Sequence, residues 1–239
     1  MDIYFNNALI GTTTVQCSVT LPKRIDYYTS HKVNDEVRGY LIYNGAWSLV
    51  ATSSVQRNWK IKKIALILES PHKDEYQQNS FTPKGPAKGI SYGTAGYSID
   101  HFLANRKWVN TMLNLNYVYE VYIMNAIPYQ CSAHNYIGQN CYCRLTKKER
   151  RDLVDEIFML MWKYTCNTTS VPFFQNDLID RIDAYTPDII INCCTKGNVK
   201  PPLQMHVYTA LSTHLSGIIL NKNYREDIHP AKIGKGCWK

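Results

Sequence analysis

The stretch that decides the fold is Ile64-Ala65-Leu66-Ile67-Leu68-Glu69-Ser70-Pro71-His72. Its first five residues are all apolar, which is typical of a strand buried on both faces of a parallel sheet. The polar residues that follow leave this strand at its carboxyl end. Ligands of α/β sheets bind at the carboxyl ends of strands, so the segment after Leu68 is the first place to look for a functional site.

Outward from this stretch, apolar runs alternate with amphipathic segments. A Thr146–Glu149 capping box predicts a helix to about Tyr164, and Ser98 is a candidate cap for a helix that reaches Leu113. Strands joined by helices imply right-handed crossovers. The predicted fold class is a three-layer α/β/α domain with a central, mainly parallel four-stranded sheet. Its strands are expected at residues 64–68, 121–124, 188–192 and 217–220.

Residues 1–60 have a different composition, rich in Tyr, Thr, Val and Ser, with a turn signal at Asn44-Gly45. We expect them to form an N-terminal extension of short strands or irregular structure. This extension would pack on a single globular unit at residues 61–239.

The composition limits the class of protein. A chain of 239 residues is long enough for one sizeable core, and no run approaches the roughly 20 apolar residues of a membrane span. The start of the sequence lacks the pattern of a signal peptide, so we expect a cytoplasmic protein with reduced cysteines. We also expect a monomer. The formal net charge of +8 suits a polyanionic partner, of which DNA is the commonest.

Several short motifs resemble, in order, those of the uracil-DNA-glycosylase superfamily. They are Glu69-Ser70-Pro71-His72, Gly85–Tyr92, Gly93-Thr94-Ala95-Gly96, Tyr122–Ala126, Pro187–Ile191 and His229-Pro230-Ala231-Lys232-Ile233. The resemblance covers roughly residues 61–235 and combines features of two branches of the superfamily. Ser70 departs from one branch, which has a water-activating Asp there. The cysteine pair that anchors an iron–sulfur cluster in the other branch is missing before the first motif, so we expect no cofactor.

The resemblance implies roles for particular residues. Glycosidic cleavage leaves positive charge on the sugar and negative charge on the base, so it needs a carboxylate near the former and donors near the latter. The implied catalytic residues are Glu69, Glu75, Asn125 and His229. The implied contacts to a flipped base are Ser70, His72, Tyr92 and Asn125, and the implied DNA contacts are Lys232, Ile233 and Lys235.

The predicted function is that of a monofunctional DNA glycosylase, which releases uracil or a modified pyrimidine and leaves an abasic site. His72 replaces a residue that, in one branch, blocks the 5-position of pyrimidines, so a 5-substituted pyrimidine could be accepted. The pattern also resembles an antiviral member of the superfamily that removes glucosylated hydroxymethylcytosine from phage DNA, which implies a role in defence. One alternative is a catalytically inactive DNA-binding module of the same fold, supported by Ser70. Another is a small-molecule hydrolase on a similar sheet.

A separate cluster contains Cys131, His134, Cys141 and Cys143. Cysteine and histidine at these spacings could form a tetrahedral zinc site. A loop with two unused thiols explains the same pattern, so no metal is assigned.

Overall fold

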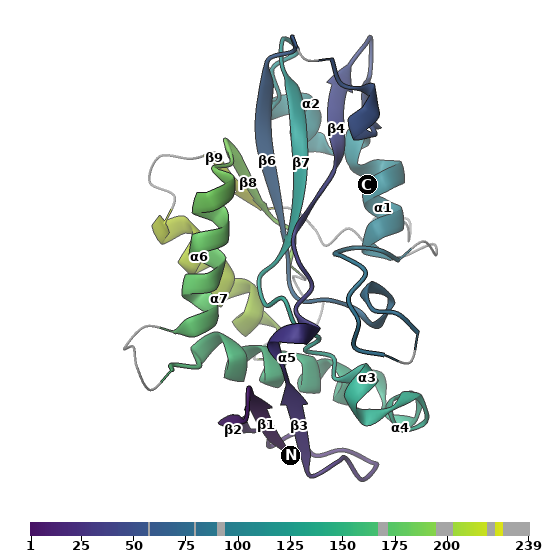
Figure 1. Cartoon of the computed structure of the whole chain (residues 1–239), viewed down its shortest axis with the longest axis vertical. Coiled ribbons are helices and arrows are strands. Elements are labelled where there is room, and N and C mark those ends of the chain that lie inside the picture. The colour runs from purple at the N-terminus through teal and green to yellow at the C-terminus, as the bar shows by residue number, and fades with distance from the viewer. Residues whose placement is uncertain are drawn as a thin grey trace.

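The computed structural model describes residues 1–56, 58–78, 80–89, 94–166, 172–194, 203–218 and 223–226 (Figure 1). Its strands are β1 (Asp2–Phe5), β2 (Ala8–Thr12), β3 (Arg24–Tyr27), β4 (Glu36–Tyr43), β5 (Trp47–Val50), β6 (Ile61–Leu68), β7 (Val118–Asn125), β8 (Ile189–Asn192) and β9 (Asn223–Glu226). Its α-helices are α1 (Ala95–Phe102), α2 (Lys107–Met112), α3 (His134–Ile137), α4 (Gln139–Arg144), α5 (Lys147–Lys163), α6 (Phe173–Tyr185) and α7 (Leu203–Ile218). Short 3₁₀ helices are η1 (Thr29–His31), η2 (Thr52–Ser54), η3 (Lys73–Glu75) and η4 (Leu103–Asn105).

The main sheet has the strand order β5-β4-β7-β6-β8-β9 in the part of the chain that the structure describes. Strands β7, β6, β8 and β9 are parallel to one another, whereas β4 runs antiparallel to both β7 and β5. The pairing of β6 with β7 is the longest register, from Ile61 opposite Val118 to Leu68 opposite Asn125. The carboxyl ends of the two central strands therefore lie side by side.

The predicted fold class is wrong, because the sheet is mixed and has six described strands instead of a mainly parallel four. The two additional strands, β4 and β5, come from the first 60 residues and form a hairpin at the predicted Asn44-Gly45 turn, where Gly45 adopts a φ of 78°. Their place beside β7 depends on a contact between distant segments. Composition and periodicity do not encode such a pairing.

Two local predictions are also wrong. Gly217 and Ile218 belong to the end of helix α7, and the outermost strand is the more polar Asn223–Glu226. Short apolar runs have no period that separates a strand from a helix, which explains the error. Ser98 lies inside α1, and Thr94 is the cap, accepting a hydrogen bond from the Tyr97 amide. The predicted helix also does not continue to Leu113, because α1 ends at Phe102 and the separate helices η4 and α2 follow. In contrast, α5 begins at the predicted Thr146–Glu149 capping box and ends one residue before Tyr164.

Helices cover both faces of the main sheet and divide the core in two (Figure 1). Along β6, Ala65 and Ile67 pack with α5, α6 and α7, while Ile64, Leu66 and Leu68 pack with α1 and α2. This alternation follows from the two-residue period of a strand. None of the described helices is both long and apolar enough to cross a membrane.

The smaller sheet, in the order β2-β1-β3, packs beside α5 (Figure 1). Its strand β1 contributes Ile3 and Phe5 to the core shared with α5 and α6. The Glu156 carboxylate on α5 accepts hydrogen bonds from the amides of Thr14 and Val15 at 2.9 and 3.0 Å. The first residues are thus fixed to the helical layer.

We predict that Gly96→Ala destabilises the protein, because a Cβ there would clash with the main-chain oxygens of Ala87 and Gly89. Overpacking of this kind costs about 1–3 kcal/mol of unfolding free energy, measurable by urea denaturation. Gly217→Ala is the control, since a Cβ at that helical position meets nothing within 4 Å. Equal stability of the Gly96→Ala and Gly217→Ala proteins would contradict the described packing of α1.

Candidate active site

The site is built around Asn125, the last residue of β7, which is fully buried. Its side chain lies on the sheet face that carries Val121 and Ile123, because residues two apart in a strand share a face. The adjacent chain continues the pairing, with the Ala126 amide donating to the Leu68 carbonyl at 2.7 Å. Asn125 is therefore held at the carboxyl end of the two central strands.

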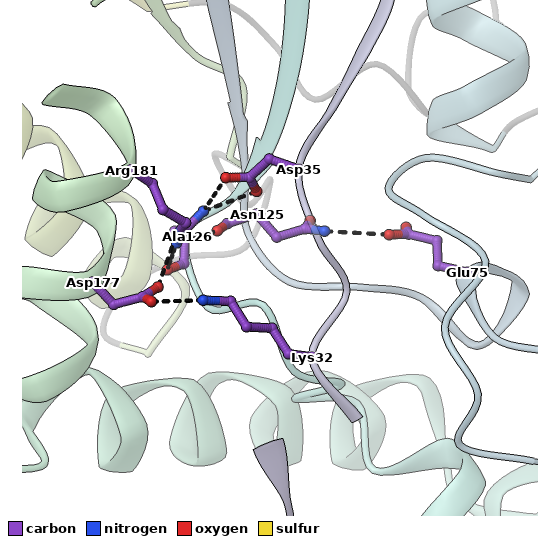
Figure 2. Close-up of polar contacts among 7 residues, drawn as sticks. All are labelled: Lys32, Asp35, Glu75, Asn125, Ala126, Asp177 and Arg181. Carbon is purple, nitrogen blue, oxygen red and sulfur yellow. Dashed lines mark hydrogen bonds and ion pairs between the residues drawn. The ribbon is translucent and has the colours of Figure 1, made fainter. Parts of the chain in front are cut away.

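Glu75 reaches Asn125 from the short helix η3. The Asn125 Nδ2 group donates to Glu75 Oε2 at 3.3 Å (Figure 2). The main-chain amide of His72 donates to Glu75 Oε1 at 3.2 Å. A further hydrogen bond comes from the main chain of Ala87. Only 4% of Glu75 is exposed, so these polar groups replace water around the carboxyl group.

Burial raises the pKa of Glu75 to about 7, against the hydrogen bonds from His72, Ala87 and Asn125 that favour the ionised form. A carboxyl group with this pKa exchanges its proton near neutral pH, as a general acid or base must. The Asn125 Oδ1 atom is also buried and has no hydrogen-bond partner among the described residues. A ligand group could occupy that position.

The other side of Asn125 is fixed by Arg181 on α6. The Arg181 Nη2 group donates to the main-chain carbonyls of Asn125 and Ala126, at 3.0 and 3.4 Å (Figure 2). Its remaining donors bind Asp35 and Asp177, and Asp177 also accepts from Lys32 at 2.7 Å. This network holds the end of β7 by its backbone while the Asn125 side chain remains available to Glu75.

Glu69 does not join this site. Glu69 comes two residues after Ile67 and therefore lies on the same face of the sheet, which α5 covers. Its carboxylate accepts hydrogen bonds from Arg151 there, at 3.1 and 3.3 Å. Arg151 also pairs with Asp155, and burial raises the pKa of Asp155 to about 7. The structure therefore places Glu69 and Glu75 on opposite faces of the sheet.

The remaining predicted residues have varied placements. Ser70 is partly buried and forms a hydrogen bond with the Cys131 thiol. The His72 side chain is 57% exposed and its Nδ1 lies 3.2 Å from Asp74. Five predicted residues lie outside the described residues: Tyr92, His229, Lys232, Ile233 and Lys235.

The possible zinc ligands do not gather in the described part of the chain, where no three His, Cys, Asp or Glu side chains are arranged for a metal. The Cys131 thiol donates to the Tyr129 carbonyl and the Cys141 thiol to the Thr20 carbonyl, while Cys143 accepts from the Gln139 amide. Each cysteine thus has a different neighbour.

Arg181 and Asp35 were not among the predicted residues. The sequence carries one signal for Arg181, since Asp177 precedes it by four residues on an amphipathic helix and such pairs lie on one face. Nothing in the sequence links Asp35 to α6, because that contact spans 146 residues.

Comparison of the chain with protein families, with curated proteins and with solved structures finds no match in any of the three.

We predict that Arg181→Met lowers the unfolding free energy by about 3–5 kcal/mol, because it leaves the 7% exposed carboxylate of Asp35 without its partner. Arg24→Met is the matched control, since Arg24 pairs with Asp26 while 52% exposed, and its loss of unfolding free energy should be much smaller. Urea denaturation measures both. Losses of similar size would show that the Arg181 network does not hold β7.

Glu75 also gives stability a specific pH dependence. The pKa of Glu75 in the folded protein lies above the ordinary 4.5. The stabilisation that this raised pKa contributes to the free energy of unfolding is therefore fully present below pH 4.5 and is lost as the pH rises through about 7. Glu75→Gln cannot ionise and removes this contribution. Between pH 5 and pH 8, wild type should therefore lose on the order of 3 kcal/mol more unfolding free energy than Glu75→Gln. Asp155 titrates in both proteins and cancels in the comparison; a pH-independent difference would contradict the raised pKa.

Proposed function

We propose that this protein is a monofunctional DNA glycosylase, which hydrolyses the bond between a flipped pyrimidine and its deoxyribose. The observation that carries the proposal is the buried Glu75 carboxyl, with a pKa of about 7, hydrogen-bonded to Asn125 at the end of β7. Glu75 lies six residues after Glu69, the spacing at which the resembling superfamily has a functional acidic residue. The net charge of +8 suits a DNA partner.

In this proposal the bond between C1′ and the base nitrogen breaks, and its electron pair leaves with the base. The oxygen of a water molecule bonds to C1′, and the proton that this water loses passes by way of Glu75 to the departing base. The ionised Glu75 also stabilises the positive charge that develops on the sugar. The products are a free base and an abasic sugar, and no cofactor takes part.

Asn125 would read the base. An amide side chain offers one acceptor and two donors, which matches the pairing edge of a pyrimidine. Its buried Oδ1 is unpaired within the described residues, while its amide nitrogen is oriented by Glu75. Base recognition and bond cleavage would thus take place at two adjoining side chains.

Of the predicted catalytic residues, Glu69 has another role in this proposal and His229 does not. Glu69 is assigned a structural role, because its carboxylate is bound to Arg151. His229 keeps the role that the resemblance implies, that of a donor to the leaving base. Uracil and 5-substituted pyrimidines remain the proposed substrates, and a cytoplasmic monomer acting in repair or in defence against phage remains the expected setting.

The test is mass spectrometry of bases released from uracil-containing, 5-methylated, hydroxymethylated and glucosylated DNA. Glu75→Gln should slow single-turnover release by about 10²–10⁴-fold, as expected when a general acid–base group is removed. Asp74→Asn is the matched control, because Asp74 is the adjacent carboxylate but is exposed and paired with His72. It should excise at the wild-type rate.

Asn125→Ala should also lose excision, and the accepted base should change if Asn125 reads its edge. Salt-sensitive DNA binding without release of any base would instead identify an inactive binding module. Absence of both would refute a DNA function.

A further inference from the structure

A concave surface lies at the end of the sheet opposite the candidate active site, and we call it the distal cavity. Its volume is about 820 Å³, within the range of ligand-binding pockets. Three loops enclose it: the β4–β5 hairpin, the segment before β6 and the segment before β7. The lining includes the aromatic residues Tyr43, Trp59 and Tyr117 and the polar residues Asn44, Asn58, Lys60 and Asn116.

The distal cavity is well separated from Glu75 and Asn125. It borders the first residues of β6 and β7, whereas the candidate active site lies beyond their last residues. Eight-residue strands at about 3.3 Å per residue place the two sites more than roughly 20 Å apart. In Figure 1 the sheet extends to this end as a projecting tip formed by β4, β6 and β7.

Three aromatic side chains line the distal cavity, and one of them, Tyr117, also packs against the core. Tyr43 is 41% exposed, and Trp59 and Tyr117 are partly buried. They differ from Trp47 and Tyr119 behind them, which are buried among core residues. Rings exposed in a cavity provide flat apolar faces on which a planar ligand can stack.

The polar lining is made of amides and a cation. Asn44, Asn58 and Asn116 are exposed, and their side-chain amides have no hydrogen bond within the described part of the chain. Lys60 is a lining residue, and Lys62 places its Nζ 4.6 Å from the centre of the Tyr117 ring. No carboxylate is among the described lining residues, so the cavity favours an anionic ligand.

Local hydrogen bonds fix the loops in this arrangement. The main-chain amide of Asn116 donates to Asn114 Oδ1 at 2.9 Å, and the main-chain amide of Asn114 donates to the Tyr119 hydroxyl at 2.8 Å. The Val118 amide donates to the Lys60 carbonyl at 3.0 Å, which joins two of the three loops. A cavity that is preorganised before binding loses less binding free energy to the ordering of its loops.

We propose that the distal cavity binds single-stranded nucleic acid. Unpaired bases would stack on Trp59 and Tyr43, the asparagine amides would bond to base edges, and Lys60 and Lys62 would neutralise phosphates. A neutral saccharide could also stack on these rings, but it would gain nothing from the lysines. This site is independent of Glu75 and does not require the protein to be a glycosylase.

The experiment measures the binding of a short fluorescein-labelled oligothymidylate to the full chain by anisotropy at several salt concentrations. Trp59→Ala should weaken binding about tenfold, the effect of removing one stacking platform, while Trp59→Phe should retain most of the affinity. Lys60→Ala should weaken binding and reduce the magnitude of the salt slope by about 0.7, the value for one phosphate contact on a single strand.

Tyr28→Ala is the matched control, because Tyr28 is 38% exposed and does not line the distal cavity. It should bind as wild type does, and circular dichroism verifies the folding of each variant. Wild-type affinity in both Trp59→Ala and Lys60→Ala would overturn the proposal. Binding of a neutral oligosaccharide that Trp59→Ala abolishes, with no effect on oligothymidylate, would also overturn it and identify a saccharide site.

Discussion

The organisation of the candidate active site depends on the hydrogen bonds of Asn125, whose side-chain amide is buried at the end of the central strand β7. A buried polar group is stable only when its hydrogen bonds are satisfied by the protein or by a ligand. Arg181 satisfies the main-chain carbonyl and Glu75 meets the side-chain nitrogen, while Oδ1 is unpaired among the described residues. The side chain is therefore fixed in orientation with one acceptor still available.

The same sheet keeps two buried carboxylate systems apart. Glu75 lies on the face of α1 and α2 and is surrounded by neutral donors, whereas Glu69 lies on the face of α5 and is paired with Arg151. A guanidinium partner favours the ionised form of a carboxyl group, and burial without a cation favours the protonated form. Of these two glutamates, Glu75 is the one that combines burial with donors that are all uncharged. This difference in surroundings, more than the position of either residue in a motif, identifies Glu75 as the acid–base candidate.

Much of the local structure could be predicted from the sequence, because its causes are local. The capping box at Thr146 and the apolar runs of β6, β7 and β8 are each encoded within a few residues. The pairing of β4 with β7 is not, since it joins segments about 80 residues apart. For the site, Asn125 and Glu75 were predicted and lie together, but the alternation that moves Glu69 to the other face was overlooked. A strand's two-residue period determines that outcome once its register is known.

In the proposed reaction, Glu75 is the group whose ionisation controls the rate. Its most direct test is the pH dependence of single-turnover base release by wild type, with the modified DNA that supports excision. If ionised Glu75 is the active form, the rate should rise about tenfold per pH unit below the pKa and level off above about pH 7. A rate that is constant from pH 5 to pH 8, or that changes only near the ordinary pKa of a glutamate, would contradict the account.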